Sequence, residues 1–263
     1  MSWINGSRSL ILVLALSASG PAGADVWDNA TNDDDAIPSF NRLANGSVQV
    51  HDLAAPGGVQ DLDFILIQTA ANASYEVLLD GITGDVNFTT GGTNSDIVRT
   101  DLSGIVLQDA VGSNGTVPVR WKTGPGGTFL NYIRVRSSNC GAGCSTSDEY
   151  TIRFRETTYA IPRFNNSATQ ITILIMSSLG SSTCTPDFLF FGGNGSLLGT
   201  HSESINNGAS MVLNTATLPF AAGTSGMIKV LHTCPYGTLT GKAVALEPGT
   251  GFTFDTAIVP VPY

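Results

Sequence analysis

Charged residues are scarce in this chain of 263 residues, and lysine and glutamate are the scarcest of them. Only 13% of the residues are Asp, Glu, Lys or Arg, against about 25% in an average soluble protein. The chain has 3 Lys and 5 Glu, and its formal net charge is −9. Nucleic acid is therefore excluded as a partner class, because neutralising phosphates requires clustered Lys and Arg. So few Lys and Glu beside 30 Gly also disfavour long helices.

The uncharged residues that predominate in the sequence are typical of β-structure. Gly, Ser, Thr and Asn are abundant, and short apolar stretches alternate with turn residues throughout the chain. No stretch has the period of 3.6 residues that an amphipathic helix requires. The sequence therefore predicts an all-β protein with two antiparallel β-sandwich domains in tandem, of the jelly-roll or immunoglobulin-like kind.

The first 24 residues have the composition of a removable export signal. Arg8 precedes a short apolar run at residues 10–16, and the small residues 22–24 form a cleavage pattern before Asp25. The run is shorter than the about 20 apolar residues of a spanning helix, so no membrane span is expected. The mature chain is predicted to begin at Asp25 and to be secreted, extracellular or at the cell surface, with the periplasm as an alternative.

Four cysteines, an even number, fit an oxidising compartment. Cys140, Cys144, Cys184 and Cys234 allow three pairings. The spacing Cys-Gly-Ala-Gly-Cys favours a local Cys140–Cys144 bridge, which leaves Cys184 to pair with Cys234. Zinc is not expected, because His232 is the histidine closest to a cysteine and no second cysteine pair has metal-like spacing.

The chain divides into two halves of different charge. Residues 25–158 contain 17 acidic and 8 basic side chains, whereas residues 159–263 contain 4 and 3. The composition changes at residues 157–162, where a proline follows a strand-like run. We therefore place the domain boundary between Thr158 and Tyr159, which gives two domains of ordinary sandwich size.

Strand-like segments recur in both halves, each bounded by Gly, Asn, Ser or Pro. In the first half they are residues 47–53, 62–68, 74–80, 104–109, 117–122, 129–136 and 149–155. In the second half they are residues 170–176, 187–191, 197–202, 209–213, 226–233, 239–246 and 251–255. The runs 171–176 and 188–191 are almost continuously apolar, which predicts central strands.

Two segments of the first half share a pattern of apolar residues and arginine. In residues 131–136 and 150–155, apolar or aromatic side chains take one face of a strand and arginines take the other. The two segments are predicted to pair as a hairpin with one solvent-exposed face, with the loop of Cys140 and Cys144 at its tip.

Short motifs in the first half follow an order known from exported bacterial proteins. They are residues 45–53 (NGSVQVHDL), 61–64 (DLDF), 74–77 (SYEV), 131–135 (NYIRV) and 150–152 (YTI). With this order, about residues 28–156 resemble a bacterial pre-peptidase C-terminal domain, an antiparallel β-sandwich appended to secreted enzymes or surface proteins. One departure is that no peptidase precedes it in this sequence. The second half resembles a further module of exported bacterial proteins without an established activity.

Acidic residues gather at the entry to the first half. Carboxylates supply the hard oxygen ligands of Ca²⁺, which takes 6–8 of them, and some relatives of the resembled family bind calcium near this entry. The candidate calcium ligands are Asp28, Asp33, Asp34, Asp35, Asp61 and Asp63. The alternative is a solvated acidic segment, because the distal bidentate Glu of a calcium loop is absent. No other cofactor is expected.

Motifs for catalysis are missing from the sequence. It contains no Gly-x-Ser-x-Gly elbow, no His-Glu-x-x-His and no phosphate-binding loop. Hydrolysis of glycosides requires two carboxylates at a set separation. The candidates for such a pair in the second half are Asp187, Glu203, Glu247 and Asp255. The chain is expected not to be an enzyme, and a secreted hydrolase is the less favoured alternative.

The leading hypothesis is a secreted or cell-surface, non-catalytic binding protein whose first domain is ordered by calcium. Its partner would be an extracellular protein or glycan, or a further copy of the same chain. Aromatic residues provide stacking platforms for such partners, but Trp121, Phe188, Phe190 and Phe191 are expected in the core. The alternative is a structural subunit of an extracellular filament or surface layer, in which residues 256–261 donate a strand or form an edge strand.

Overall fold

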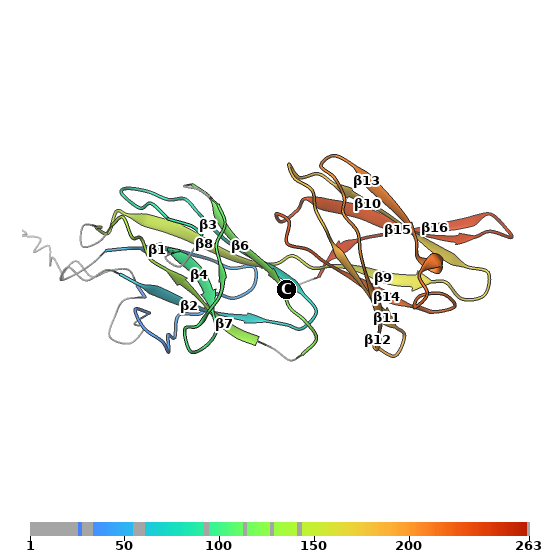
Figure 1. The fold of residues 1–263 in the computed structure, drawn as a ribbon, viewed down its shortest axis with the longest axis horizontal. Coiled ribbons are helices and arrows are strands. Elements are labelled where there is room, and N and C mark those ends of the chain that lie inside the picture. Colours follow the sequence, from blue (N-terminus) through green and yellow to red (C-terminus); the bar gives the residue numbers. More distant parts are fainter. Residues whose placement is uncertain are drawn as a thin grey trace, which may run out of the picture.

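The computed structural model describes residues 26–27, 34–54, 61–91, 95–112, 115–126, 129–140 and 144–261. Within these ranges the regular structure is β-strand, apart from the 3-10 helix η1 (Thr215–Thr217). Figure 1 shows two β-sandwiches arranged along the long axis of the molecule. The predicted all-β class is confirmed. None of the helical structure in these ranges is long and apolar enough to cross a membrane, and the predicted export signal at residues 1–24 lies outside them.

The first sandwich consists of two antiparallel four-stranded sheets. One sheet has the order β1-β8-β3-β6 and the other β2-β7-β4-β5. The strands are β1 (Val48–Asp52), β2 (Asp63–Thr69), β3 (Ser74–Asp80), β4 (Ile97–Thr100), β5 (Val106–Asp109), β6 (Val117–Lys122), β7 (Phe129–Val135) and β8 (Glu149–Glu156).

Aromatic and β-branched side chains fill the interior of the first sandwich. Tyr75, Trp121 and Phe154 stack on one another with ring centroids 5.5 to 6.3 Å apart. Ile65 and Ile133 are fully buried in the same cluster. The prediction that Trp121 is a core residue is confirmed, and stacked aromatic pairs of this kind add about 0.5–1.5 kcal/mol beyond their burial.

The predicted hairpin between residues 131–136 and 150–155 is wrong. β7 pairs with β2 and β4, whereas β8 pairs with β1 and β3, so the two strands lie in opposite sheets. The alternation of apolar residues and arginine identifies which face of each strand turns inward, but it does not identify the neighbouring strand. The connection that carries the disulfide Cys140–Cys144 therefore crosses from one sheet to the other.

The second sandwich consists of a four-stranded and a five-stranded sheet. Their orders are β13-β10-β15-β16 and β12-β11-β14-β9-β17. The strands are β9 (Tyr159–Asn165), β10 (Ile171–Ser178), β11 (Asp187–Gly192), β12 (Leu197–Ser202), β13 (Ser210–Asn214), β14 (Ser225–Leu231), β15 (Leu239–Glu247), β16 (Phe252–Ala257) and β17 (Val259–Pro260). β10 and β11 are interior strands, as their apolar runs predict.

The two sandwiches have separate hydrophobic clusters. One cluster draws on residues 43–154 and the other on residues 159–258. Thr157 and Thr158 alone separate β8 from β9, and the N–H of Val261 returns to donate to the carbonyl of Thr158 at 3.0 Å. The predicted boundary falls between the two clusters. That each sandwich folds as an independent domain stays a prediction.

Two disulfides join the four cysteines. Cys140 is bonded to Cys144, and Cys184 is bonded to Cys234 across a separation of 50 residues. This is the pairing that the sequence spacing favours. The larger bridge anchors the connection between β14 and β15 to the segment before β11.

Candidate functional site

The structure gathers two of the predicted calcium ligands around a histidine. Asp34 lies in the segment before β1, His51 lies on β1, and Asp63 begins β2 in the opposite sheet. All three are fully buried, and their ligand atoms lie within 4.8 Å of one another. The N–H of Phe64 donates to the carbonyl of Asp34 at 2.8 Å, which holds the N-terminal segment beside β2. We call these three residues the acid–histidine cluster.

Two further predicted calcium ligands, Asp35 and Asp61, lie among the described residues but are not members of this three-residue group. Asp35 accepts the N–H of Leu62 at 3.4 Å. Asp61 is buried next to the start of β2, two residues before Asp63. Asp28 and Asp33 lie outside the described residues.

Hydrogen bonds and ring stacking fix the side chains of the acid–histidine cluster. The amide of Asn41 donates to Asp34 Oδ2 at 2.8 Å, and the hydroxyl of Tyr150 donates to Asp63 Oδ2 at 2.5 Å. The ring of Tyr150 also stacks on His51, with centroids 5.4 Å apart. His51 Nδ1 lies 4.0 Å from Asp34 Oδ2 and 3.9 Å from Asp63 Oδ1. The imidazole therefore faces two carboxylates at once.

The donor set decides which cation suits the cluster. Two carboxylates and an imidazole are ligands that Zn²⁺ or Mn²⁺ accepts, whereas Ca²⁺ requires 6–8 oxygens. His51 Nε2 lies 3.2 Å from Gln49 Oε1, an outer contact that orients the ring so that Nδ1 faces the carboxylates. The described residues thus bring together three side chains that could ligate a divalent cation.

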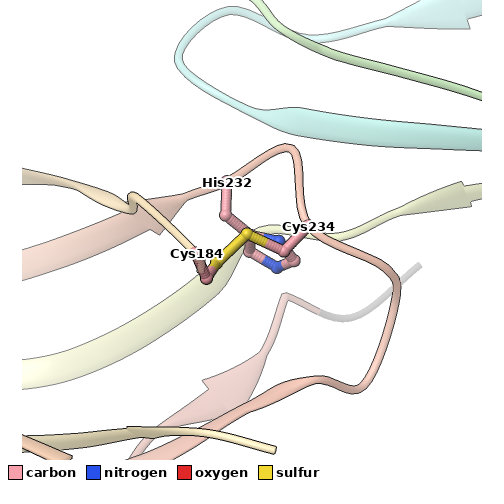
Figure 2. Close-up of side chains that lie close together, drawn as sticks. All are labelled: Cys184, His232 and Cys234. Atoms are coloured by element: carbon pink, nitrogen blue, oxygen red, sulfur yellow. A yellow bond between two sulfur atoms is a disulfide. The ribbon is translucent and has the colours of Figure 1, made fainter. Parts of the chain in front are cut away.

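A second group with ligand-like spacing lies at the connection between the sandwiches (Figure 2). It consists of Cys184, His232 and Cys234. The two sulfurs are bonded to each other, so neither is a thiolate that could bind zinc. His232 is fully buried, and its ring stacks on Tyr159 with centroids 5.7 Å apart. In this oxidised form the group is not a metal site.

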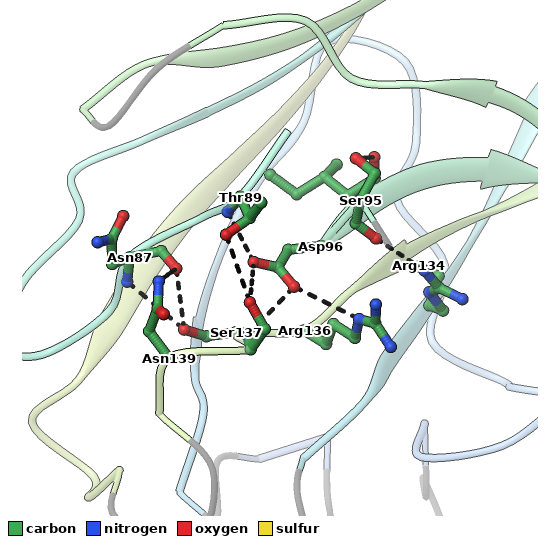
Figure 3. Close-up of polar contacts among 10 residues, drawn as sticks. Asn87, Thr89, Ser95, Asp96, Arg134, Arg136, Ser137 and Asn139 are labelled. Carbon is green, nitrogen blue, oxygen red and sulfur yellow. Dashed lines mark hydrogen bonds and ion pairs between the residues drawn. The ribbon is translucent and has the colours of Figure 1, made fainter. Parts of the chain in front are cut away.

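A buried carboxylate organises the loops at one end of the first sandwich (Figure 3). Asp96 accepts the N–H groups of Thr89 and Ser138 at 2.6 and 3.1 Å, and the hydroxyl of Ser138 at 2.9 Å. The guanidinium of Arg136 lies 3.4 Å from its other side. Because the carboxylate is fully buried and surrounded by donors, it stabilises the loops rather than offering a ligand site.

The four carboxylates considered for glycoside hydrolysis have different surroundings. Three of them form ion pairs at 2.5 to 3.3 Å, namely Asp187 with Lys122, Glu203 with His201, and Asp255 with Lys242. Glu247 lines a groove of the second sandwich. The structure therefore distributes the four among separate ion pairs and a groove.

This groove, of about 190 Å³, opens beside the edge strand β16. Phe252 and Phe254 form its aromatic side, and as alternate residues of one strand they face the same way. They are 69% and 61% exposed, unusually high values for phenylalanine. Arg163, Gln170 and Glu247 supply its polar lining. The groove thus combines an exposed aromatic pair with planar polar groups.

Small side chains on β15 leave the space for the groove. Ala243 and Ala245 line it, and their cross-strand partners on β16 are Thr256 and Phe254. A larger residue at position 245 would fill the space beneath the aromatic pair. Arg163 forms no ion pair with another described residue.

No family model matches this chain. No curated protein matches it either. Among solved structures it is similar to a glycosyl hydrolase family 2 member from Bacteroides cellulosilyticus, with 12% identity and a TM-score of 0.20. It is also similar to a calcium-binding mutant of β-glucuronidase 2 from Bacteroides uniformis, with 8% identity and a TM-score of 0.22.

These two similarities cover most of this chain but little of the other proteins. They cover 87% and 83% of this chain, and 30% and 28% of the hydrolase chains, so the chain spans less than a third of their length. TM-scores of this size carry no argument about activity. The resemblance of residues 28–156 to a pre-peptidase C-terminal domain stays a prediction.

Sequence patterns identify Asp34 and Asp63 as neighbours in a site but do not identify His51, Phe252 or Phe254. His51 is read as part of a strand motif, and its approach to the two carboxylates depends on how the sheets pack. A usable signal exists for the groove, because two phenylalanines in alternation occur in a strand whose other residues are polar or small.

Proposed function

We propose that the protein is an exported, non-catalytic binding protein that holds a neutral glycan in the groove beside β16. The observation that carries this proposal is the exposed pair Phe252 and Phe254 at the side of a polar groove. Export is supported by the two disulfides, since such bonds form and persist in oxidising compartments. The protein would act outside the cytoplasm, in the surroundings of the cell or at its surface.

The groove has the chemistry that recognises a sugar. A sugar ring has an apolar face that stacks on aromatic side chains, and hydroxyls that pair with planar polar groups. The two phenylalanines supply the stacking surface, and Arg163, Gln170 and Glu247 supply the hydrogen bonds. Arg163 and Glu247 have opposite charges, so their charges cancel. A neutral ligand therefore matches the groove better than an acidic or a basic one.

The carboxylate content of the groove supports binding rather than hydrolysis. Glu247 is the one carboxylate among the described residues that line it. Retaining and inverting glycosidases use two carboxylates on either side of the scissile bond. A groove with one carboxylate and an aromatic pair is suited to hold a chain without cleaving it.

Titration calorimetry of the purified protein with neutral oligosaccharides tests the proposal. We expect one of a panel of gluco-, xylo- and manno-oligosaccharides to bind, and the double variant Phe252→Ala/Phe254→Ala to weaken binding at least tenfold. Each aromatic contact is worth about 0.5–1.5 kcal/mol beyond its buried area, and about 1.4 kcal/mol is tenfold in affinity. Val212→Ala is the control, because Val212 is 68% exposed on the opposite edge strand of the same sheet.

Two outcomes would contradict the proposal that the ligand is a neutral glycan. The first is an absence of binding to every neutral oligosaccharide in the panel. The second is binding that survives the double substitution, which would place the ligand elsewhere. Capture of an extended peptide along β16 that requires both phenylalanines would keep the groove and replace the glycan by a protein partner.

Calcium, or another divalent cation, is the second part of the proposal. The cation would be held by Asp34, Asp63 and His51, and calcium would need further oxygen ligands from neighbouring residues. A ligand at 100 times its dissociation constant adds about 2.7 kcal/mol to the free energy of unfolding. We expect added Ca²⁺ to raise the melting temperature above that in chelator, and Asp63→Asn to abolish the rise. Asp101→Asn, in an exposed turn, is the control.

The ion that raises the melting temperature identifies the metal that the site prefers. If Zn²⁺ raises the melting temperature and Ca²⁺ does not, the site belongs to a transition metal, as the imidazole suggests. If no cation changes it, the cluster is a charge-balanced structural network and the calcium proposal fails.

A structural subunit is a second candidate function, favoured by the edge strand β5. Strand β5 and the turn before it expose four apolar side chains, between 46% and 64% of each. These are Leu102, Ile105, Val106 and Leu107. An exposed apolar edge is open to strand addition. The predicted donor, residues 256–261, forms edge strands within the chain instead, because β16 pairs with β15 and β17 with β9. A monomer in size-exclusion chromatography would reject this candidate.

A further inference from the structure

The two sandwiches are joined by side-chain contacts as well as by Thr157 and Thr158. Nζ of Lys122, in the first sandwich, lies 2.5 Å from Oδ2 of Asp187, in the second. Lys229 of the second donates to the carbonyl of Asn72 of the first at 3.4 Å. These two contacts join the sandwiches in addition to the short covalent connection.

The connection between β14 and β15 makes a further set of contacts across this junction. We call it the 232–238 loop. The N–H of Tyr236 donates to Glu76 Oε2 at 3.3 Å, and the guanidinium of Arg155 lies 5.0 Å from the centre of the Tyr236 ring. Glu76 is itself paired with Arg120 at 2.5 Å. The disulfide at Cys234 anchors the loop to the second sandwich.

His232 begins this loop and is fully buried (Figure 2). Its ring stacks on Tyr159, the first residue of β9. Neither ring nitrogen has a hydrogen-bond partner within bonding distance among the described residues. The site therefore suits a neutral imidazole, and the backbone of Cys234 and of Thr157 stabilises a charged one only in part.

The charged groups around His232, like its burial, favour the neutral form of the ring. The pKa of His232 is lowered to about 4, mainly by burial, and the charges of Arg120 and Lys122 on β6 contribute in the same direction. The backbone of Cys234 and of Thr157 opposes this effect in part. The carboxylates closest to those two cations, Glu76 and Asp187, are already paired with them.

We propose that His232 makes the junction between the sandwiches sensitive to acid. Neutral His232 permits the closed arrangement, in which the 232–238 loop lies against the first sandwich. Protonation places an uncompensated charge in the junction beside two cations, and it releases the loop so that the sandwiches move about Thr157 and Thr158. The proposal requires only the proton that acidification provides.

The pH window follows from the two values of the His232 pKa. In an open junction the exposed ring has its ordinary pKa of about 6.5, whereas in the closed junction the pKa is about 4. The open form therefore binds the proton more tightly, and the closed form loses stability as the pH falls from about 6.5 toward 4. Over this window the ratio of closed to open molecules falls by about two orders of magnitude.

Glu156, at the end of β8, titrates in the opposite sense. Burial raises the pKa of its carboxyl, and the hydroxyl of Thr158 and the charge of Lys229 partly oppose the rise. Its protonation favours the closed form as the pH falls. Substitution of His232 is therefore needed to isolate the effect of the histidine.

Hydrogen exchange of the purified protein between pH 7 and pH 4.5 tests the proposal. We expect the protection of the Tyr236 N–H, corrected for the intrinsic exchange rate, to fall at least tenfold over this range. Amides at the start of β10 should keep their protection, because it is the other end of this strand, at Ser178, that pairs with Leu239 beside the 232–238 loop. In His232→Phe, which keeps a ring against Tyr159 but does not titrate, the protection of Tyr236 should not change with pH. His201→Phe, on the outer strand β12, is the control and should behave as the unsubstituted protein.

Three results would overturn the proposal. Protection of Tyr236 that is constant from pH 7 to pH 4.5 is the first, and an equally steep fall in His232→Phe is the second. If that variant does not fold, the NMR titration of the His232 ring in the unsubstituted protein decides the matter. A pKa at or above 6 for the closed protein would then contradict the proposal.

Discussion

The two sandwiches differ in the polar groups that they bury. All buried carboxylates of the described chain belong to the first sandwich: Asp34, Asp52, Asp61, Asp63, Glu76, Asp96 and Asp148. The buried polar side chains of the second sandwich, within the described residues, are neutral: Asn166, Thr172, Ser178, Thr215 and His232. A buried charge is tolerated only when it is paired or surrounded by donors. The first sandwich therefore depends on specific polar networks, and the second on apolar packing and its disulfide.

This difference shows how two sandwiches of one architecture respond to different conditions. Ionised carboxylates make the first sandwich sensitive to strong acid and to the loss of single hydrogen bonds. The second sandwich buries no carboxylate among its described residues, and its one buried histidine is His232 at the junction.

Removal of the larger disulfide should affect the second sandwich most. In Cys184→Ala/Cys234→Ala we expect its free energy of unfolding to fall by about 4 kcal/mol, because the bridge closes a long loop in the unfolded chain. The matched variant Cys140→Ala/Cys144→Ala opens a loop of only 4 residues and should cost about 2 kcal/mol in the first sandwich. Amide exchange in β10 and β3 measures the two sandwiches separately. Equal losses in both would contradict the contrast.

Substitution of one buried polar residue in each sandwich, Asp96 in the first and Asn166 in the second, should lower the free energy of unfolding of both. The loss of the charged Asp96 should cost more than the loss of the neutral Asn166. Asp96→Ala leaves the donors of Thr89 and Ser138 unpaired, which we expect to cost about 3 kcal/mol. In the second sandwich Asn166 accepts from the Thr172 N–H and the Thr215 hydroxyl, both at 2.9 Å.

Because those bonds are between neutral groups, Asn166→Ala should cost about 2 kcal/mol. Urea unfolding gives both values. Tryptophan fluorescence reports the first sandwich alone, since Trp27 and Trp121 are the tryptophans of the chain after residue 24. A larger loss for Asn166→Ala than for Asp96→Ala would reverse the comparison.

Acid should weaken the first sandwich through Asp148. The N–H of Asp85 and the N–H and hydroxyl of Ser145 hold the pKa of this carboxyl below its ordinary value. A lowered pKa gives stability that is present above about pH 4 and is lost as the pH falls further. Asp148→Asn should therefore be less stable at pH 7 by about 1 kcal/mol, and should lose less on transfer to pH 3.

Asp255→Asn is the control for this prediction. Asp255 pairs with Lys242 on the exposed edge of the second sandwich, and such pairs contribute about 0.5 kcal/mol. If Asp148→Asn and the unsubstituted protein lose equal stability between pH 7 and pH 3, another carboxylate carries the acid response.

Sequence patterns predict most strands but not those that depend on distant partners. β4 is short and follows polar residues, so its sequence does not predict a strand. It forms one because it pairs with β7 on one side and β5 on the other. β9 contains Pro162, which argues against a strand interior. The opposite strand β14 shifts register between Gly226 and Ile228, and this irregularity accommodates the proline.

The pairing of strands and the sites are harder to predict than the strands. Alternation in β7 and β8 gives the buried face but not the sheet, which is why the predicted hairpin is wrong. Asp34 and Asp63 meet because a backbone hydrogen bond of Phe64 holds the N-terminal segment beside β2. His51 lies on β1, in the sheet opposite that of Asp63. Each of these contacts depends on tertiary packing, on which local sequence carries no information.

The spacing of Phe252 and Phe254 sets a minimum length for the ligand. Alternate residues of a strand are separated by about 6.6 Å along its axis, so one sugar ring cannot cover both aromatic faces. A monosaccharide would meet a single phenylalanine and bind weakly, whereas a chain of two or more units would engage both rings together. The groove would therefore distinguish polymer from free sugar by length, before any hydroxyl is compared.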